Sequence, residues 1–133
     1  MKNRFTLRLI LGLFLVVGAS AQAADARFKP LFNGKNLDGW EPTPGGKWEV
    51  KNGVIVGTSP KSERRHGILL TKKRFKDFVV KAKFRVIHGD SGFYFRVDRV
   101  KSGVSVHGFQ VEIDETDETG GLYETGGRGW VHQ

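Results

Sequence analysis

The fold is decided by an alternating stretch of aromatic, aliphatic and polar residues, Phe93-Tyr94-Phe95-Arg96-Val97-Asp98. Alternation with a period of two places successive side chains on opposite faces of a β-strand. The apolar members of this stretch are therefore expected on one face, and Tyr94, Arg96 and Asp98 on the other. The preceding residues 88–92 contain Gly, Asp and Ser and predict a turn that starts the strand.

A second alternating stretch, residues 109–114, follows after a turn near residues 102–103. It predicts another strand, whose polar face carries Gln110, Glu112 and Asp114. If the two strands are neighbours, their polar side chains form one hydrogen-bonding patch beside an aromatic ring, which is typical of carbohydrate sites. The plainer interpretation is a solvent-exposed sheet face with weak cross-strand pairs, such as Arg96 with Glu112.

The rest of the chain also favours strands and tight turns over helices. Eighteen of the 133 residues are glycine, about twice the usual share, and no segment beyond residue 24 has a sustained helical period. Asn52-Gly53 lies between two short apolar runs and predicts a two-residue hairpin. Residues 78–86 alternate and predict a half-buried strand with a basic outer face. We therefore expect one all-β domain, an antiparallel sandwich or jelly roll.

The N-terminal residues 1–24 have the pattern of a secretory signal peptide. Lys2, Arg4 and Arg8 precede an apolar run, residues 9–17, and small residues follow at 19–24. The apolar run is too short to cross a bilayer, for which about 20 residues are needed. The pattern predicts a secreted or periplasmic protein with no stable membrane anchor after signal cleavage, and a single domain over residues 25–133.

Charge and cysteine content restrict the chemistry that the chain can perform. There is no cysteine, which excludes disulfides, thiol nucleophiles and Cys-type zinc sites. The net charge is +8, with ten Lys or Arg in residues 61–85 and six acids in residues 110–125. No nucleic-acid-binding motif accompanies the basic zone, so we interpret it as a solvated face and expect no nucleic-acid partner.

Several segments, in this order along the chain, resemble the motifs of one family. They are Leu31-Phe32-Asn33-Gly34-Lys35-Asn36-Leu37-Asp38-Gly39-Trp40, Trp48-Glu49-Val50-Lys51-Asn52-Gly53-Val54-Ile55, Gly67-Ile68-Leu69-Leu70-Thr71, Phe75-Lys76-Asp77-Phe78, Ser91-Gly92-Phe93-Tyr94-Phe95-Arg96, Gly108-Phe109-Gln110-Val111-Glu112-Ile113-Asp114 and Thr119-Gly120-Gly121-Leu122-Tyr123. The chain resembles the 3-keto-disaccharide hydrolases, formerly a domain of unknown function, over residues 28–125. The resemblance implies a concanavalin A-like jelly roll and an oxidised di- or oligosaccharide as substrate.

The chain departs from the family pattern at three places. Asp90 stands where the family usually has Asn, and Gln110 and Glu112 reverse the family's order of Glu then Gln. Since alternate residues of a strand are about 7 Å apart, the reversal moves the negative charge along the same face. Family members also continue with further strands beyond the Gly-Leu-Tyr turn. We therefore expect a domain whose C-terminal strands are missing, and a chain of marginal stability or activity.

The resemblance implies an exported hydrolase that acts on 3-keto-glycosides. The C3 carbonyl acidifies the proton at C2, so that a base removes it, the oxygen at C1 leaves, and water then adds. We expect Glu112 or Asp114 to be the base and Arg96 to stabilise the developing charge. The substrate-binding residues expected from the two strands and the following turn are Tyr94, Gln110, Asp98 and Tyr123.

Two alternative functions and the cofactor question stay open at this stage. The acidic run from Glu112 to Glu118 also resembles the paired-carboxylate strand of laminarinase-like retaining glycoside hydrolases. A lectin-like module without catalysis would use Trp130, Tyr123 or Tyr94 to stack on sugar rings. No cofactor and no metal ligand is assigned. A proton donor or a divalent metal ligand among His66, His88 and His107, and calcium bound by the acidic run, stay open as alternatives.

Overall fold

The computed structural model describes residues 28–101 and 103–133, and the predicted signal peptide, residues 1–24, lies outside these residues. The chain divides into two units, Met1–Pro30 and Leu31–Gln133, and all the strands described belong to the second. Every regular element described is a β-strand and every strand pairing is antiparallel. This confirms the predicted all-β fold class and agrees with an antiparallel jelly-roll sandwich. The strands are β1 (Trp40–Pro42), β2 (Lys47–Lys51), β3 (Val54–Thr58), β4 (Leu69–Thr71), β5 (Ser91–Arg99), β6 (Val106–Ile113), β7 (Leu122–Thr125) and β8 (Gly129–His132).

The N-terminal part of this unit forms two small two-stranded sheets. Strand β1 pairs with β4, and β2 pairs with β3 through the predicted hairpin. Asn52 and Gly53 form the turn with φ of 50° and 76°, the left-handed conformation that a two-residue hairpin turn requires. Trp48 of β2 lies across its partner Gly57, and its indole nitrogen donates a hydrogen bond of 2.8 Å to the Gly67 carbonyl.

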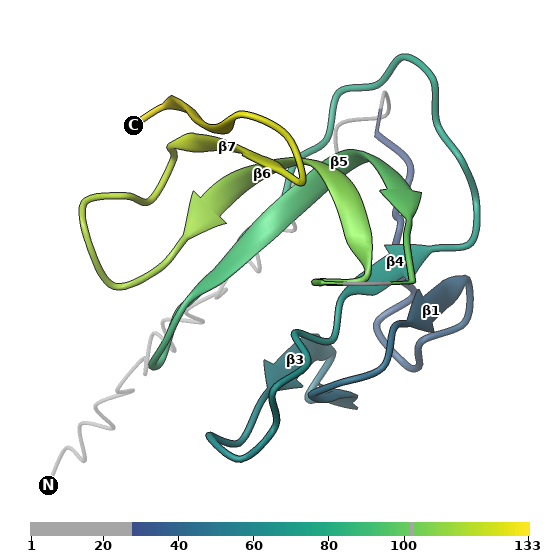
Figure 1. Ribbon diagram of the computed structural model, residues 1–133. Helices are drawn as coiled ribbons and strands as arrows, with labels where there is room; N and C mark the ends of the chain where they lie inside the picture. Colours follow the sequence, from purple (N-terminus) through teal and green to yellow (C-terminus); the bar gives the residue numbers. More distant parts are fainter. Residues whose placement is uncertain (1–27, 102) are drawn as a thin grey trace, which may run out of the picture. The chain divides into compact units, whose positions relative to one another are not determined.

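The C-terminal part is a four-stranded sheet in the order β5-β6-β7-β8, with consecutive strands adjacent (Figure 1). This order confirms that the two alternating stretches of the sequence are neighbours. The first half of β5 is in register with β6, so that Tyr94 pairs with Gln110 and Phe95 with Phe109. The paired phenylalanine rings stack with their centroids 5.7 Å apart. Tyr94 and Gln110 are therefore on one face, and the phenylalanines are on the other.

A β-bulge interrupts the pairing of β5 and β6 after Phe95, and pairing resumes between Asp98 and His107. Arg96 in the bulge has a φ of 50°, which is uncommon for a residue with a side chain. Because a bulge inserts one extra residue, it reverses the facing of every residue that follows it. Asp98 thus takes the facing of His107 and Phe109, opposite to that of Tyr94. The uninterrupted alternation expected for residues 93–98 is wrong beyond Phe95.

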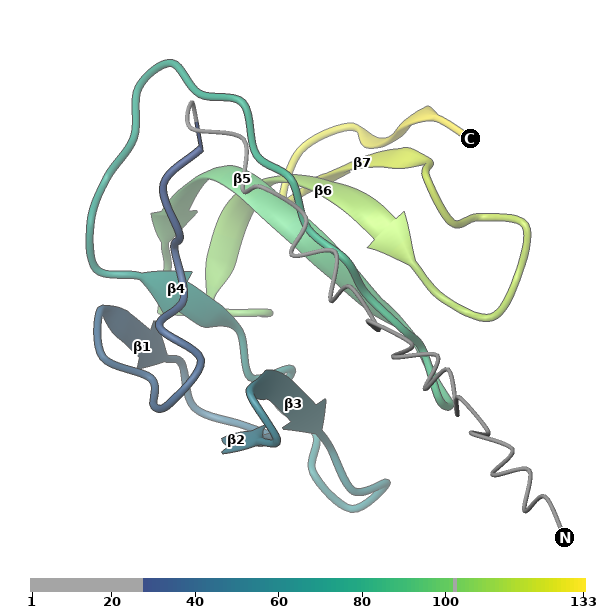
Figure 2. The same ribbon diagram turned by 180° about the vertical axis from the view of Figure 1, so that it is seen from behind.

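Residues 78–86 do not form the predicted strand, since they belong to none of the sheets within the described part of the chain. In Figure 2 the segment runs beside β5, and the two segments line the same hollows, but no strand pairing joins them. Its side chains are mostly exposed, including Phe84 at 60% exposure, and only Val80 and Val86 are half-buried. The alternation of the sequence is therefore not matched by an alternation of burial.

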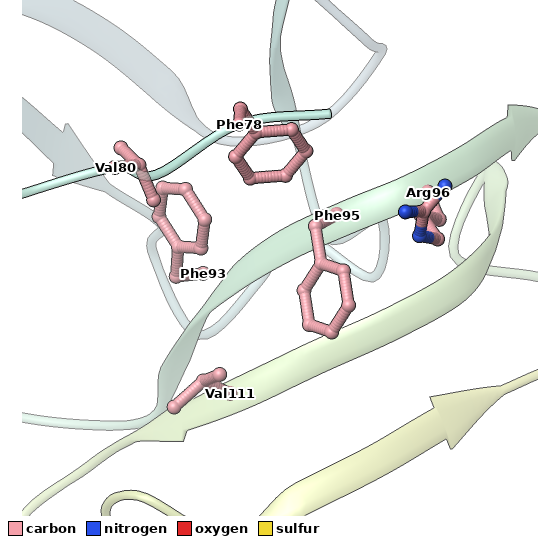
Figure 3. A pocket seen from close by; sticks show the side chains of 6 residues that line it. All are labelled: Phe78, Val80, Phe93, Phe95, Arg96 and Val111. Carbon is pink, nitrogen blue, oxygen red and sulfur yellow. The ribbon is translucent and has the colours of Figure 1, made fainter. Parts of the chain in front are cut away.

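An apolar surface lies between residues 78–84 and the phenylalanine face of β5 and β6. A hollow of about 370 Å³ is lined there by Phe78, Val80, Phe93, Phe95, Arg96 and Val111 (Figure 3). A second hollow of about 310 Å³ is bordered by apolar residues of the same two segments and also by Glu112. Among the described residues only one apolar side chain, Val106, is fully buried, so most of the apolar surface is only half-covered. No helix in this part of the chain is long and apolar enough to cross a membrane.

Candidate functional site

The polar face of the four-stranded sheet is crossed by a row of four paired residues. Tyr94 pairs with Gln110, Gln110 with Tyr123, and Tyr123 with Trp130, one residue from each of β5, β6, β7 and β8. Residues paired in this way share a face and lie within contact distance of one another. Three aromatic rings and an amide are thereby placed side by side on one surface. This row contains Tyr94, Gln110 and Tyr123, three of the residues predicted to bind substrate.

Glu112 lies in the next row of the same face. It is 7% exposed, which is unusual for a carboxylate. Gln110 donates a hydrogen bond from Nε2 to Glu112 Oε1. Burial raises the pKa of Glu112 above its ordinary value of 4.5, and the nearby negative charge of Asp90 raises it further, while the hydrogen bond from Gln110 opposes the shift. A carboxylate with a raised pKa and a fixed orientation is suited to accept a proton near neutral pH.

Glycines flank Glu112 on both neighbouring strands. Gly92 is its partner on β5, and on the other side the Glu112 amide donates a hydrogen bond of 2.9 Å to the Gly121 carbonyl. A Cβ atom at Gly92 would lie 2.7 Å from Gln110 Oε1, and one at Gly121 would lie 2.7 Å from Trp130 Cζ3. The absence of side chains at both positions therefore leaves room for the amide of Gln110 and the indole of Trp130 on either side of Glu112.

Tyr94 provides a hydroxyl group close to this carboxylate. Its Oη shares a hydrogen bond of 3.1 Å with Thr125 Oγ1 on β7. Burial raises the pKa of Tyr94 above its ordinary value of 10, and the negative charges of Glu112 and Asp90 act in the same direction, whereas the hydrogen bond with Thr125 lowers the pKa. The phenol consequently stays protonated at neutral pH and is available as a hydrogen-bond donor.

Asp114, the other predicted base, is held in a turn of its own. Its carboxylate accepts hydrogen bonds from the Thr116 amide at 3.0 Å and from Thr119 Oγ1 at 2.8 Å, and the Thr116 hydroxyl also donates to it. These hydrogen bonds, those of the two hydroxyl groups first, lower the pKa of Asp114 below its ordinary value of 3.8. A carboxylate that is stabilised in its ionised form is a weak base. Asp114 therefore stabilises the turn after β6, and Glu112 is the better candidate for proton abstraction.

The structure does not bring Arg96 and Asp98 into the cluster formed by Tyr94, Gln110 and Glu112. Arg96 is exposed in the bulge and lines the apolar hollow together with Phe93 and Phe95 (Figure 3). Asp98 is exposed and pairs with His107 beyond the bulge. Their expected position beside Glu112 assumed unbroken alternation, which the positive φ of Arg96 ends.

Two polar residues of the cluster were not predicted from the sequence. Thr125 is the partner of the Tyr94 hydroxyl, and Asp90 is close enough for its charge to raise the pKa values of Tyr94 and Glu112. Asp90 directly precedes the Ser-Gly of the aromatic motif, so its position in that motif was an available signal. The pairing of β5, β6 and β7 that brings Thr125 near Tyr94 had no counterpart in the local sequence pattern.

The candidate metal ligands are dispersed in the described part of the chain. Within residues 28–101 and 103–133, no group of three or more His, Asp or Glu side chains is arranged to hold a metal ion. His88 Nδ1 lies 3.0 Å from Glu115 Oε2, and His107 is the strand partner of Asp98.

Comparison with known proteins adds one finding to this geometry. The model of the family described as 3-keto-alpha-glucoside-1,2-lyase-like domain matches residues 27–132. The match includes all eight strands and the whole cluster around Glu112. No curated protein and no solved structure matches the chain.

Proposed function

Because the chain belongs to the 3-keto-alpha-glucoside-1,2-lyase-like family, a family of carbohydrate-acting domains, we propose that it cleaves 3-keto-glycosides by removing the proton at C2. The single observation that carries this proposal is the environment of Glu112. It is a buried carboxylate with a raised pKa, held by Gln110 on the same sheet face as the phenol of Tyr94. Such an elimination needs a base with a pKa nearer neutrality than that of an ordinary carboxylate.

The reaction begins with proton transfer from C2 of the oxidised ring to Glu112. The electron pair of the C2–H bond is delocalised toward the C3 carbonyl, whose oxygen becomes an enolate. Tyr94 Oη and Gln110 Nε2 are the neutral donors available to stabilise that oxygen. The enolate electrons then form the C1–C2 double bond, the C1–O bond breaks, and the leaving sugar takes a proton from solvent. Addition of water to the unsaturated product would complete a net hydrolysis.

Glu112 is assigned as the base in preference to Asp114 for an electrostatic reason. The pKa of Glu112 is raised chiefly by burial, whereas the pKa of Asp114 is lowered by the hydroxyl groups of its turn. A higher pKa means greater affinity for the transferred proton, and protonation of Asp114 would weaken the hydrogen bonds that its carboxylate accepts from Thr116 and Thr119. Arg96, expected from sequence to stabilise charge, has no part in this scheme because it lies in the bulge.

A proton NMR time course in D₂O tests the reaction, with a 3-keto-α-glucosyl disaccharide as substrate and an enzyme-free sample to measure spontaneous exchange at C2. An olefinic product, or a hydrated product with deuterium at C2, is expected. Cleavage with the C2 proton retained would contradict the proposal and favour a direct glycosidase of the laminarinase type. Broadening of the sugar signals without cleavage would instead favour the lectin-like module.

We also propose that residues 1–24 direct export, so that the substrate is met outside the cytoplasm. The basic start, short apolar run and small residues of this segment support the proposal. Expression of the full chain in a bacterium, followed by mass spectrometry of the extracytoplasmic fraction, is expected to give a chain that begins after Ala23 or Ala24. An intact N-terminus in the cytoplasmic fraction would contradict it.

A further inference from the structure

Trp130 on β8 is an exposed aromatic residue whose ring packs against Tyr123 and lies over Gly121. It is 38% exposed, and its ring meets the ring of its strand partner Tyr123 edge-to-face, with centroids 5.3 Å apart and an interplanar angle of 90°. The space next to it is free of a side chain at Gly121, where a Cβ atom would lie 2.7 Å from Trp130 Cζ3. An indole that is exposed and yet held in place offers a flat apolar surface to a ligand.

This indole is adjacent to the proposed base. The Gly121 carbonyl accepts the hydrogen bond of the Glu112 amide, so Gly121 lies directly beside Glu112. The edge of the Trp130 ring lies over Gly121 and is therefore next to Glu112. Neighbouring strands are about 4.8 Å apart, which is close to the width of one pyranose ring. A disaccharide with its reacting ring over Glu112 therefore reaches Trp130 with its second ring.

The two sides of Glu112 differ in chemistry, and this difference orients the substrate. On the β5 side, the amide of Gln110 fills the space over Gly92, with the protonated hydroxyl of Tyr94 in the neighbouring row. That side offers an amide and a phenolic hydroxyl, which form hydrogen bonds with the carbonyl and hydroxyl groups of an oxidised ring. On the β7 and β8 side, the indole offers an apolar face, which suits the C–H groups of an unoxidised pyranose.

We propose that Trp130, supported by Tyr123 and Gly121, is the binding subsite for the sugar that leaves with the C1 oxygen. The assignment rests on the proposed function, since it takes Glu112 as the base at C2. It makes the second ring of the substrate a specificity determinant. A leaving group without a ring would gain nothing from this subsite.

The test compares two substrates that differ only in the leaving group, a 3-keto-α-glucosyl disaccharide and methyl 3-keto-α-glucoside. In Trp130→Ala, kcat/KM for the disaccharide is expected to fall by about tenfold more than kcat/KM for the methyl glycoside, the loss typical of one aromatic contact. Trp130→Phe should recover part of the difference. Val131→Ala is the matched control, because Val131 is the next residue and is 39% exposed.

A second variant keeps the indole but displaces it. Gly121→Ala places a methyl group within 2.7 Å of the ring and should produce the same selective loss for the disaccharide. Equal losses for both substrates in Trp130→Ala and Gly121→Ala, or no loss in either, would overturn the subsite while leaving the proposed reaction intact. Failure of the wild-type chain to cleave either substrate would overturn the proposed function, and the subsite with it.

Discussion

Replacing Glu112 by glutamine tests whether its burial serves catalysis, because the substitution keeps the shape of the side chain and removes only its charge and basicity. In the wild-type chain the side chain is 7% exposed and accepts a hydrogen bond from Gln110. The amide oxygen of glutamine can accept the same hydrogen bond. We expect Glu112→Gln to lose activity and, at neutral pH, to gain stability.

The size of the first effect follows from the role assigned to the residue. A positioned general base contributes about 10²- to 10⁴-fold to the rate, so kcat/KM for a 3-keto-disaccharide should fall by that factor. At about 1.4 kcal/mol for each tenfold change, this is about 3 to 6 kcal/mol of transition-state stabilisation. Glu41→Gln is the matched control, since it makes the same chemical change in an exposed ion pair with Arg99.

The sign of the second effect follows from the pKa of Glu112. Burial and the charge of Asp90 raise that pKa in the folded chain above the ordinary value of 4.5. Below the ordinary value the carboxyl is protonated in both the folded and the unfolded chain, and no penalty arises. As the pH rises through the folded-state pKa, the buried group ionises and folding stability is lost. Glu112→Gln cannot ionise, so its advantage in melting temperature should appear above the folded-state pKa and vanish near pH 4.

The assays are initial rates on the 3-keto-disaccharide and thermal unfolding followed by circular dichroism between pH 4 and pH 8. Unchanged kcat/KM would show that another group is the base. A variant less stable than wild type at neutral pH would show that the carboxylate is a net stabilising partner. Either result would refute the link drawn here between desolvation of Glu112 and its function.

Three further substitutions test neighbouring features of the chain. Asp114→Asn should lower kcat/KM far less than Glu112→Gln, and an equal loss of activity in the two variants would contradict the assignment of the base. It should also lower the melting temperature at neutral pH. Since the folded-state pKa of Asp114 is depressed, this difference in melting temperature should disappear as the pH falls through that pKa. Gly92→Ala should displace the amide of Gln110 and, by removing a hydrogen bond that lowers the pKa of Glu112, shift the acidic limb of the pH–rate profile upward; an unshifted limb would count against it. Gly53→Ala should lower the free energy of unfolding, measured by urea titration, by about 1 kcal/mol, because φ is 76° at this position and alanine rarely adopts that conformation. An unchanged urea midpoint would contradict this prediction.

Much of the sheet could be predicted because the decisive signals are local. Asn52-Gly53 between two apolar runs predicted a hairpin, and the structure has the turn with both residues in the left-handed conformation. Alternation in residues 93–98 and 109–114 predicted two strands, and the pairing of β5 with β6 places Tyr94, Gln110 and Glu112 on one face as expected. The period of the side chains is uninterrupted in β5 as far as Phe95 and along β6.

Prediction stopped where the backbone departs from the regular period. The bulge at Arg96 requires a positive φ, which arginine rarely adopts. The residue pattern therefore does not predict the bulge. The consequence reaches beyond one residue, since Asp98 changes its facing as well. Residues 78–86 were predicted to form a strand because they alternate, but they pair with no other strand in the part of the chain that the structure describes. Alternation alone does not make a strand when strand pairing is missing.

The choice between two carboxylates also depended on information that alternation does not contain. Glu112 and Asp114 are two residues apart and have the same parity, so the sequence pattern treated them alike. The structure separates them through their surroundings, with burial for Glu112 and the hydroxyl groups of Thr116 and Thr119 for Asp114. The spacing Asp-x-Thr was a readable signal, because an Asp often accepts hydrogen bonds from the residue two positions later in a turn.

Gln110 and Glu112 stand in the reverse of the order expected from the family resemblance, and the geometry of the sheet accommodates the carboxylate at position 112. The two side chains are hydrogen-bonded to each other, so exchanging them preserves the pair and shifts the carboxylate by about 7 Å along the strand. The shift moves it from the row of Tyr94 and Tyr123 into the row where both cross-strand neighbours are glycines. Only in that row do the spaces left by Gly92 and Gly121 admit an amide on one side and an indole on the other. Restoring the family order by the double substitution Gln110→Glu with Glu112→Gln should therefore place the carboxylate between two aromatic rings, and lower kcat/KM even though the composition of the site is unchanged.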